Sequence, residues 1–349
     1  MPVSPRSRSI LLALAGIAVV LLGGEVVVRL LLASPSPVEP SARFEYQYRP
    51  FTRVVTSYEG YSVQRTNSLG LFDDELRVPR PARRVLLVGD SYAEGLQVPH
   101  DSAFAAVAER LLPGTEIVNA GQGGASLLDD VEWVELHGPA IAPDVIVLEV
   151  ADANLELLLK PATLARFASP PRPGVIEPPP VLHGFDRLLF EARRNSALFT
   201  LASRRLKLLL NEQRTDLSRR FRESKARKVV RLQTVAVNDA RMPGILDTLY
   251  QRLAKFASHV VIVYVPNLDY FSPGLPESDP RLAHLLRDVC ARHGGTLLDA
   301  GAAMREEFRR TGQPLQGFPN SVVGQGHINV AGHRVVGELL ARALAEPAS

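Results

Sequence analysis

From residue 84 onward, short apolar runs alternate with amphipathic segments. Runs of roughly four to eight residues rich in valine, leucine and isoleucine are typical of strands buried on both faces of a parallel sheet. The segments between them carry apolar residues three and four positions apart, which is the spacing of a helix packed on such a sheet. The predicted strands are 84–88, 115–119, 144–150, 259–265 and 296–298, and the predicted helices are 103–112, 127–137, 282–293 and 332–344.

This alternation predicts one α/β domain, over residues 81–349, with a parallel sheet covered on both faces. Residues 41–80 form a polar arm with several tyrosines, which we expect to be irregular, with short strands, and to pack on the domain. Residues 156–245 break the rhythm as an insert that is first proline-rich and then helical. Its basic stretch, residues 204–231, fits either a solvated helix face or contact with anionic lipid headgroups.

Residues 1–40 predict a membrane anchor followed by a short linker. The apolar run at residues 10–33 has the length that crosses a bilayer. Its two charges, Glu25 and Arg29, are four residues apart and can pair on one helix face near the outer end. Arginines before the run favour a cytoplasmic N-terminus, which places the rest of the chain on the extracytoplasmic side. A cleaved signal peptide is the alternative, although the run is long for one.

The composition of the chain limits the kinds of function that it can have. The 349 residues are 46% hydrophobic and 22% charged, which is enough for one large domain with a packed core. The net charge of +3 and the aromatic content of 6% give no reason to expect nucleic acid as a partner. The single cysteine, Cys290, cannot form an internal disulfide and is expected in the core. No Cys/His cluster has the spacing of a metal site.

Polar residues and glycines follow the first three predicted strands and precede the last helix. Because parallel strands end at one edge of the sheet, Ser91, a glycine cluster, Asn154 and His327 are expected to meet there. A serine that opens a helix has an exposed hydroxyl, and a histidine beside it can take the serine proton. A glycine amide and the Asn154 side chain can supply an oxyanion hole. Each of these features also has a simpler explanation. Asp90 could be an acid of a phosphate or metal site, and the glycine cluster could be only a turn. Asn154 could only cap a helix, and His327 could be an ordinary surface histidine.

In their order and spacing these loops resemble the SGNH/GDSL hydrolase family, including bacterial members with an N-terminal membrane anchor. The resemblance covers about residues 60–155 and 245–345. Its segments are Asn67-Ser68-Leu69-Gly70, Gly89-Asp90-Ser91 with Tyr92-Ala93-Glu94-Gly95, Asn119-Ala120-Gly121-Gln122-Gly123-Gly124, Asn154, and His327-Ile328-Asn329 with Gly332-His333.

The resemblance implies a three-layer α/β/α sandwich of the flavodoxin-like SGNH hydrolase type. It implies Ser91 as nucleophile, His327 as base, and an oxyanion hole made by Ser91, Gly124 and Asn154. The implied reaction is hydrolysis of an acyl ester through an acyl-serine intermediate, without a metal or an organic cofactor. Export and anchoring favour an O-acyl group on an envelope glycan or a lipid as substrate. The alternatives are an O-acyltransferase and a non-catalytic protein that binds a glycan or another partner on the same scaffold.

Two positions depart from the family pattern. The family usually has an aspartate two or three residues before the histidine, where this chain has Gln325 and Gly324. That leaves a Ser–His dyad, an acid from elsewhere in the chain, or a weakened enzyme. Gln325 can hydrogen-bond the ring but cannot offset its charge. In the third block, Leu155 follows Asn154 in place of the usual aspartate, and Ala153 is the alternative for the asparagine position.

Overall fold

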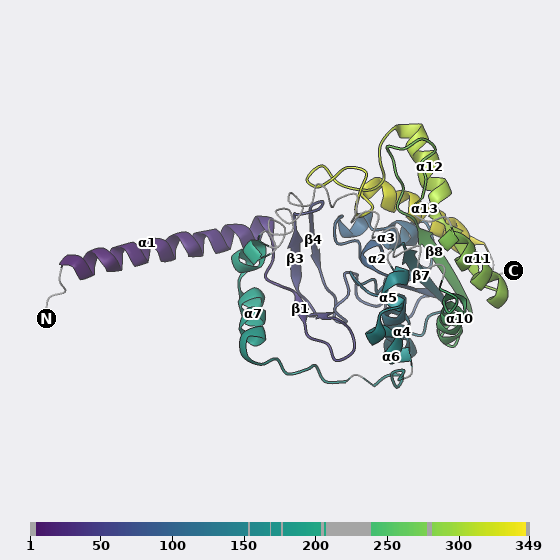
Figure 1. Cartoon of the computed structure of the whole chain (residues 1–349), viewed down its shortest axis with the longest axis horizontal. Coiled ribbons are helices and arrows are strands. Elements are labelled where there is room, and N and C mark those ends of the chain that lie inside the picture. The colour runs from purple at the N-terminus through teal and green to yellow at the C-terminus, as the bar shows by residue number, and fades with distance from the viewer. Residues whose placement is uncertain are drawn as a thin grey trace.

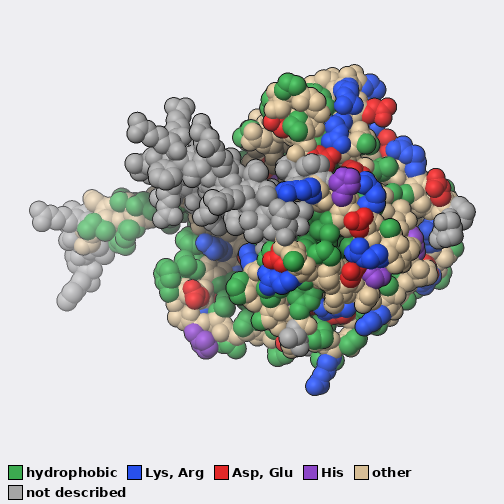
Figure 2. Space-filling model, turned by 45° about the vertical axis from the view of Figure 1, so that its right-hand side comes forward, with side chains coloured by type: hydrophobic (Ala, Val, Ile, Leu, Met, Phe, Trp, Pro, Cys, Tyr) green, Lys and Arg blue, Asp and Glu red, His purple; other side chains and the backbone are tan. Residues whose placement is uncertain are grey.

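A computed structural model describes residues 5–152, 154–167, 169–175, 177–203, 206, 239–277 and 281–346. Ala153 and nearly all of the basic stretch at 204–231 lie outside the described residues. Figure 1 shows a long N-terminal helix that projects from an α/β body, with the C-terminus on the opposite side of that body. The face drawn in Figure 2 has basic and acidic side chains interspersed.

The central sheet has five parallel strands in the order β6-β5-β7-β8-β9. All five strands predicted from the apolar runs are confirmed, each within one residue at either end. The chain runs from β5 outward to β6 and then crosses back to β7 on the other side, so the loop after β5 lies where the winding reverses. The strands are β5 Arg83–Val88, β6 Thr115–Asn119, β7 Val145–Ala151, β8 His259–Val265 and β9 Thr296–Asp299.

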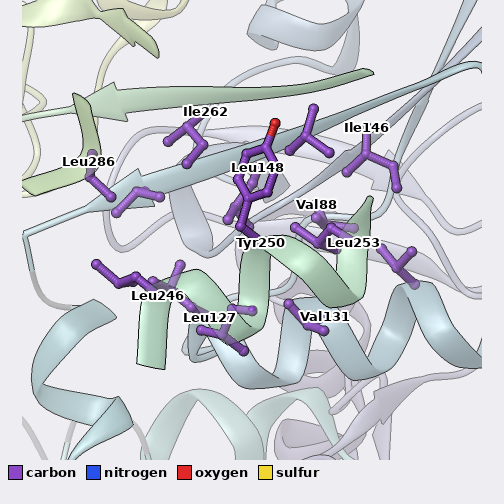
Figure 3. Close-up of a cluster of buried hydrophobic side chains, with 14 of the residues drawn as sticks. Val88, Leu127, Val131, Ile146, Leu148, Leu246, Tyr250, Leu253, Ile262 and Leu286 are labelled. Carbon is purple, nitrogen blue, oxygen red and sulfur yellow. The ribbon is translucent and has the colours of Figure 1, made fainter. Parts of the chain in front are cut away.

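Helices cover both faces of the sheet, because successive side chains of a buried strand point to opposite sides. One layer is α4 Leu127–Ile141, α10 Met242–Leu253 and α11 Arg281–His293; the other is α3 Phe104–Arg110, α12 Ala300–Thr311 and α13 Val330–Ala345. In Figure 3, Val88, Ile146, Leu148 and Ile262 of the sheet pack on Leu127 and Val131 of α4 and on Leu246, Tyr250 and Leu253 of α10. The predicted three-layer α/β/α architecture is confirmed, and Cys290 is buried in its core.

The four predicted helices are present, but α10 and α12 were not predicted. α10 begins with Met242-Pro243-Gly244, where proline and glycine obscure the start of a helical pattern. α12 starts directly after β9, with Asp299 as its N-cap, so no turn separates strand from helix. Tertiary packing decides both of these elements more than local sequence does.

Two small antiparallel hairpins lie between the N-terminal helix and the sheet. β1 Val38–Glu39 pairs with β2 Gln47–Tyr48, and β3 Arg53–Thr56 pairs with β4 Ser62–Arg65. The remaining short elements are α2 Ser91–Glu94, the 3₁₀ turn His100–Ser102, α5 Asn154–Leu158, α6 Pro161–Phe167 and α7 Gly184–Asn195.

The N-terminal helix α1, Pro5–Val27, continues into a π-helical turn, Val28–Leu32. Ser7–Leu32 contains an 18-residue window with a mean hydropathy of 2.5 and is long and apolar enough to cross a membrane, a property shared by anchors and signal sequences. The expected ion pair within it is formed, with Arg29 Nη2 2.8 Å from Glu25 Oε1.

Candidate active site

Ser91 opens helix α2 directly after β5. Asp90 is the N-cap of this short helix, and its carboxylate accepts a hydrogen bond from the Tyr92 amide at 2.9 Å. Gly95 ends the helix in the left-handed conformation, with φ +63°. This tight turn presents Ser91 at the carboxyl edge of the sheet, where the sequence places it.

His327 lies next to Ser91, and its Nε2 is 2.9 Å from Ser91 Oγ. The histidine directly precedes α13, whose N-cap Asn329 accepts from the amides of Ala331 and Gly332. The His327 carbonyl accepts from the Gly317 amide at 2.8 Å, which fixes the backbone behind the ring. The structure therefore brings together two residues that are 236 positions apart in the chain.

The second ring nitrogen of His327 contacts Glu59, a residue that was not among the predicted site residues. His327 Nδ1 is 2.7 Å from Glu59 Oε2, and the His327 amide donates to Glu59 Oε1 at 3.0 Å. Glu59 lies in the turn between β3 and β4, within the N-terminal arm. When Nδ1–H donates to this carboxylate, Nε2 is the nitrogen free to accept from the Ser91 hydroxyl.

Glu59 is suited to be the charged partner of the ring. Burial raises the pKa of Glu59, but the hydrogen bonds and charge of His327 outweigh burial and hold the pKa below its ordinary value. The carboxylate is therefore ionised at neutral pH. The positions where the family usually has its acid contribute no such group: Gln325 is exposed, and within the described residues its side chain makes no hydrogen bond to His327. Of the alternatives that the missing aspartate left open, the geometry fits an acid from elsewhere in the chain.

Gly326 makes room for Glu59. Its φ is +91°, which favours glycine, and a Cβ there would lie 2.4 Å from Glu59 Oε1. A side chain at 326 would therefore push the carboxylate away from the ring.

The Gly326→Ala variant should lose at least about tenfold in kcat for an ester substrate, because displacing a catalytic group by about 1 Å can cost up to 100-fold. Gly114→Ala is the matched control: Gly114 has φ +80° with no atom within 4 Å of an added Cβ. It carries the same backbone strain without the clash. Equal kcat values for the two variants, measured with stability checked by thermal unfolding, would contradict a role for the Gly326–Glu59 contact.

The second glycine loop faces the same site. Gly124, with φ +82°, lines a cavity together with Ser91 and His327. The preceding Gly123 is held from both sides: its amide donates to Glu94 Oε1 at 3.1 Å, and its carbonyl accepts from the Tyr46 hydroxyl at 2.6 Å. Neither the Ser91 amide nor the Gly124 amide donates to an acceptor among the residues that the structure describes.

Asn154 lies at the start of α5, completely buried beside the nucleophile loop. Its Oδ1 accepts from the Ala151 amide at 2.6 Å. Its Nδ2 donates to Asp90 Oδ2 at 3.3 Å and to the Ala125 carbonyl at 3.2 Å. Both distances are longer than the usual value of about 2.9–3.0 Å for such bonds. Its amide hydrogens therefore already have protein acceptors, though long ones, and Asn154 does not line the cavity.

Behind the serine, Asp90 is paired with Glu149 of β7, whose Oε2 accepts from the Asp90 amide at 3.0 Å. Burial raises the pKa of both carboxyls, and the charge of Asp90 raises the pKa of Glu149 further. A carboxyl whose pKa is raised is ionised less readily, which limits the negative charge near the place where an oxyanion would develop.

The cavity beside Ser91 has a volume of about 410 Å³. The sheet edge forms one wall, and the N-terminal arm forms the other. The Tyr48 hydroxyl donates to Glu94 at 2.5 Å, so the arm is fastened to α2 next to the nucleophile. Among the described residues, the lining of the cavity includes no lysine or arginine; the linker contributes Ser34 and Ser36, and the arm contributes Tyr46, Tyr48, Val55 and Tyr58.

The fold and this geometry define a class: an α/β protein with a serine, a histidine and a carboxylate in one hydrogen-bonded row, the arrangement of serine hydrolases. The sequence profile of the GDSL-like lipase/acylhydrolase family matches residues 87–335. The chain therefore belongs to this family of ester hydrolases. The matched range contains Ser91 and His327 but begins after Glu59.

Several solved structures are similar to the chain. They include a lipolytic G-D-S-L family protein from Veillonella parvula, 14% identical over 76% of this chain and 100% of that chain, with a TM-score of 0.41. A catalytic mutant of an acetylxylan esterase from Geobacillus stearothermophilus is 12% identical over 77% and 96% of the two chains, with a TM-score of 0.42. An α/β hydrolase from the Lake Arreo metagenome is 16% identical over 76% and 96%, with a TM-score of 0.40. No curated protein is significantly similar to the chain in sequence.

Proposed function

We propose that the protein is a membrane-anchored serine esterase whose nucleophile, base and acid are Ser91, His327 and Glu59. The observation that carries the proposal is the unbroken row from Ser91 Oγ to His327 Nε2 at 2.9 Å and from His327 Nδ1 to Glu59 at 2.7 Å. The non-catalytic alternative rested on the missing acid, and Glu59 removes that ground. An O-acyltransferase would use the same three groups and differ in its acceptor.

The chemistry follows from this row. As Ser91 Oγ attacks the acyl carbonyl, His327 Nε2 takes its proton, and the charge that develops on the ring is stabilised by Glu59. His327 then returns the proton to the leaving alkoxide, which leaves an acyl-serine. A water molecule, deprotonated by His327 in the same way, hydrolyses the acyl-serine and restores the hydroxyl of Ser91.

The oxyanion hole that we propose consists of the amides of Ser91 and Gly124 and the side chain of Asn154. The assignment of the two amides is supported by their position at the cavity, and by the fact that neither donates to an acceptor among the described residues. The assignment of Asn154 is supported by its long hydrogen bonds to Asp90 and Ala125, since the side-chain amide can give up one of these acceptors to donate to the substrate oxygen.

If Asn154 is such a donor, Asn154→Ala should lower kcat by at least about 100-fold, roughly 3 kcal/mol of transition-state stabilisation. Steady-state kinetics and thermal unfolding should be measured on the same preparation. A variant with unchanged kcat and a lower melting temperature would show that Asn154 only supports the loops around Asp90 and Ala125. The hole would then consist of the backbone amides.

The substrate that we propose is an O-acyl ester of an envelope glycan or a lipid. Ser34 and Ser36, which line the cavity, follow the apolar helix within a few residues of its end at Leu32. If that helix is an anchor, the cavity opens beside the membrane surface. The described residues of the lining include no lysine or arginine, which favours a neutral ester over a phosphate group.

Turnover of a short-chain aryl ester by the full-length protein tests the proposed reaction. We expect release of the phenol and transfer of the acyl group to water. Absence of both turnover and an acyl-enzyme would contradict the esterase. Acyl transfer to an added glycan, faster than to water, would identify a transferase.

The anchor and its orientation have their own test. The basic residues before the apolar run predict that a reporter fused after residue 349 is active only if it functions outside the cytoplasm. Activity of a strictly cytoplasmic reporter at that position would contradict the proposed orientation, whatever the result with esters.

A further inference from the structure

Helix α7 of the insert has an apolar stripe that is largely exposed in the described part of the protein. Phe185, Leu188, Leu189 and Ala192 follow the i, i+3, i+4, i+7 pattern of one helix face. α7 has no buried residue: Phe185 and Leu188 are 69% and 64% exposed, and Leu189 and Ala192 are half-buried. An amphipathic helix of this kind needs an apolar neighbour to bury its stripe.

The segment that follows α7 is joined to the outer end of α1. Glu25 of α1 accepts from the amides of Ala197 and Leu198, at 2.7 and 2.9 Å, and so caps the helical segment at residues 197–203. Arg29 donates to the Asn195 carbonyl at 2.8 Å. Val28 and Ala33 pack against Ala197, with Leu198 and Leu201 alongside. The insert is thus held at the level where the apolar helix ends.

The apolar stripe faces away from the rest of the protein. At the end of α7, Arg194 pairs with Glu39 of β1 at 3.5 Å, and the Arg193 carbonyl accepts from the Ser36 amide at 2.8 Å. Phe185 is nine residues before Arg194, about two and a half turns, so it lies on the opposite side of the helix from the arm. Figure 1 shows α7 below the outer end of α1 and roughly perpendicular to α1, on the side of the body from which α1 projects.

We propose that α7 lies in the outer interfacial layer of the bilayer that α1 crosses, with its apolar stripe in the lipid. The inference rests on α1 being a membrane segment and does not depend on the catalytic proposal. Val26, Val27 and Leu30 of the apolar helix, near its junction with the insert, are also exposed. An amphipathic helix of this kind lies parallel to the membrane, with its apolar face buried about 5–10 Å deep. A second contact with the bilayer fixes how the body and its cavity sit on the membrane surface.

Nitroxide spin labels on the full-length protein in liposomes of phosphatidylcholine and phosphatidylglycerol test this placement. The label is attached at Leu188→Cys, and collisions with oxygen, which concentrates in lipid, are compared with collisions with a water-soluble nickel chelate. We expect the Leu188 label to collide preferentially with oxygen, and Phe185→Cys to repeat the result. Cys290 is buried at 3% exposure and leaves the unsubstituted chain as the labelling blank.

Two control positions sharpen the comparison. Arg187→Cys places the label on the exposed polar side of the same helix, and Val78→Cys places it on the α/β body, where Val78 is 93% exposed. Both labels should collide preferentially with the chelate. If the Leu188 and Phe185 labels behave like the Arg187 label, α7 lies in water and the proposal fails. If they are accessible to neither reagent, protein covers the stripe, and the proposal fails equally.

Discussion

Ser91→Ala and His327→Ala should each abolish ester turnover, with a loss of about a millionfold in kcat if the pair supplies the nucleophile and its base. The reason is that their single hydrogen bond of 2.9 Å is the route by which the nucleophile loses its proton. The double variant should be no worse than either single variant, because the two groups act as a unit. Turnover of a short-chain aryl ester, with burst kinetics, measures this.

His284→Ala is the matched control for these variants, since His284 is exposed on α11, which lies on the sheet face opposite α13. It should retain full turnover. If Ser91→Ala keeps its activity, the hydrolysis comes from another group and the proposed nucleophile is wrong. Additive losses in the double variant would mean that Ser91 and His327 act separately.

Glu59→Gln should lower kcat by about 1,000- to 10,000-fold, as loss of the acid of a serine–histidine–aspartate row does. The amide has nearly the shape of the carboxylate but offers N–H to a ring nitrogen that must itself donate. The ring is then held in the wrong tautomer and its developing charge is not stabilised. Glu39→Gln makes the same change in the linker just before the arm, at an ion pair with Arg194 of 3.5 Å, and should leave kcat unchanged.

Placing a carboxylate at the position where the family usually has its acid is a second test of whether Glu59 serves as the acid in this protein. Gln325→Asp should not raise the rate of the wild-type protein, because Glu59 already accepts from His327 Nδ1. A large increase would show that the ring lacks support in the wild-type protein. That outcome would favour the under-supported dyad over the row with Glu59.

The contact between Glu59 and His327 also makes the stability of the folded protein depend on pH. The pKa of Glu59 is lowered in the folded protein, so the folded state binds protons less readily than the unfolded state does. The stabilisation that Glu59 contributes is complete above its unfolded pKa and is lost as the pH falls through its folded pKa. The difference in melting temperature between wild type and Glu59→Gln should therefore shrink in acid. A difference that grows as the pH falls would contradict the sign.

The fold was predictable because its signals are local. Each strand of the sheet is an apolar run that a window of about ten residues reveals, and all five are where these runs place them. Ser91 and Gly124 are recognisable by the strand ends they follow. α12 was missed because Asp299 ends a strand and caps a helix at the same residue, which leaves no turn to detect.

Glu59 was not predictable from the sequence. It is 268 residues from His327, and only the packing of the arm across the sheet edge brings the two together. No spacing rule connects them, and Glu59 stands outside the range matched by the family profile. Two nearby features agree with its position in hindsight: Gly326, where a side chain would strike the carboxylate, and the absence of an acid at 324 and 325. The hydrogen bonds of Asn154 are likewise a product of tertiary packing.

The rate at which a fluorophosphonate probe labels Ser91 tests most directly whether Glu59 completes the catalytic row. The probe reports the activation of the serine without requiring the natural substrate. We predict that the wild-type protein is labelled at Ser91 and that Glu59→Gln is labelled about 1,000-fold more slowly, while Glu39→Gln is labelled at the wild-type rate. Labelling of Glu59→Gln as fast as the wild type would contradict the account.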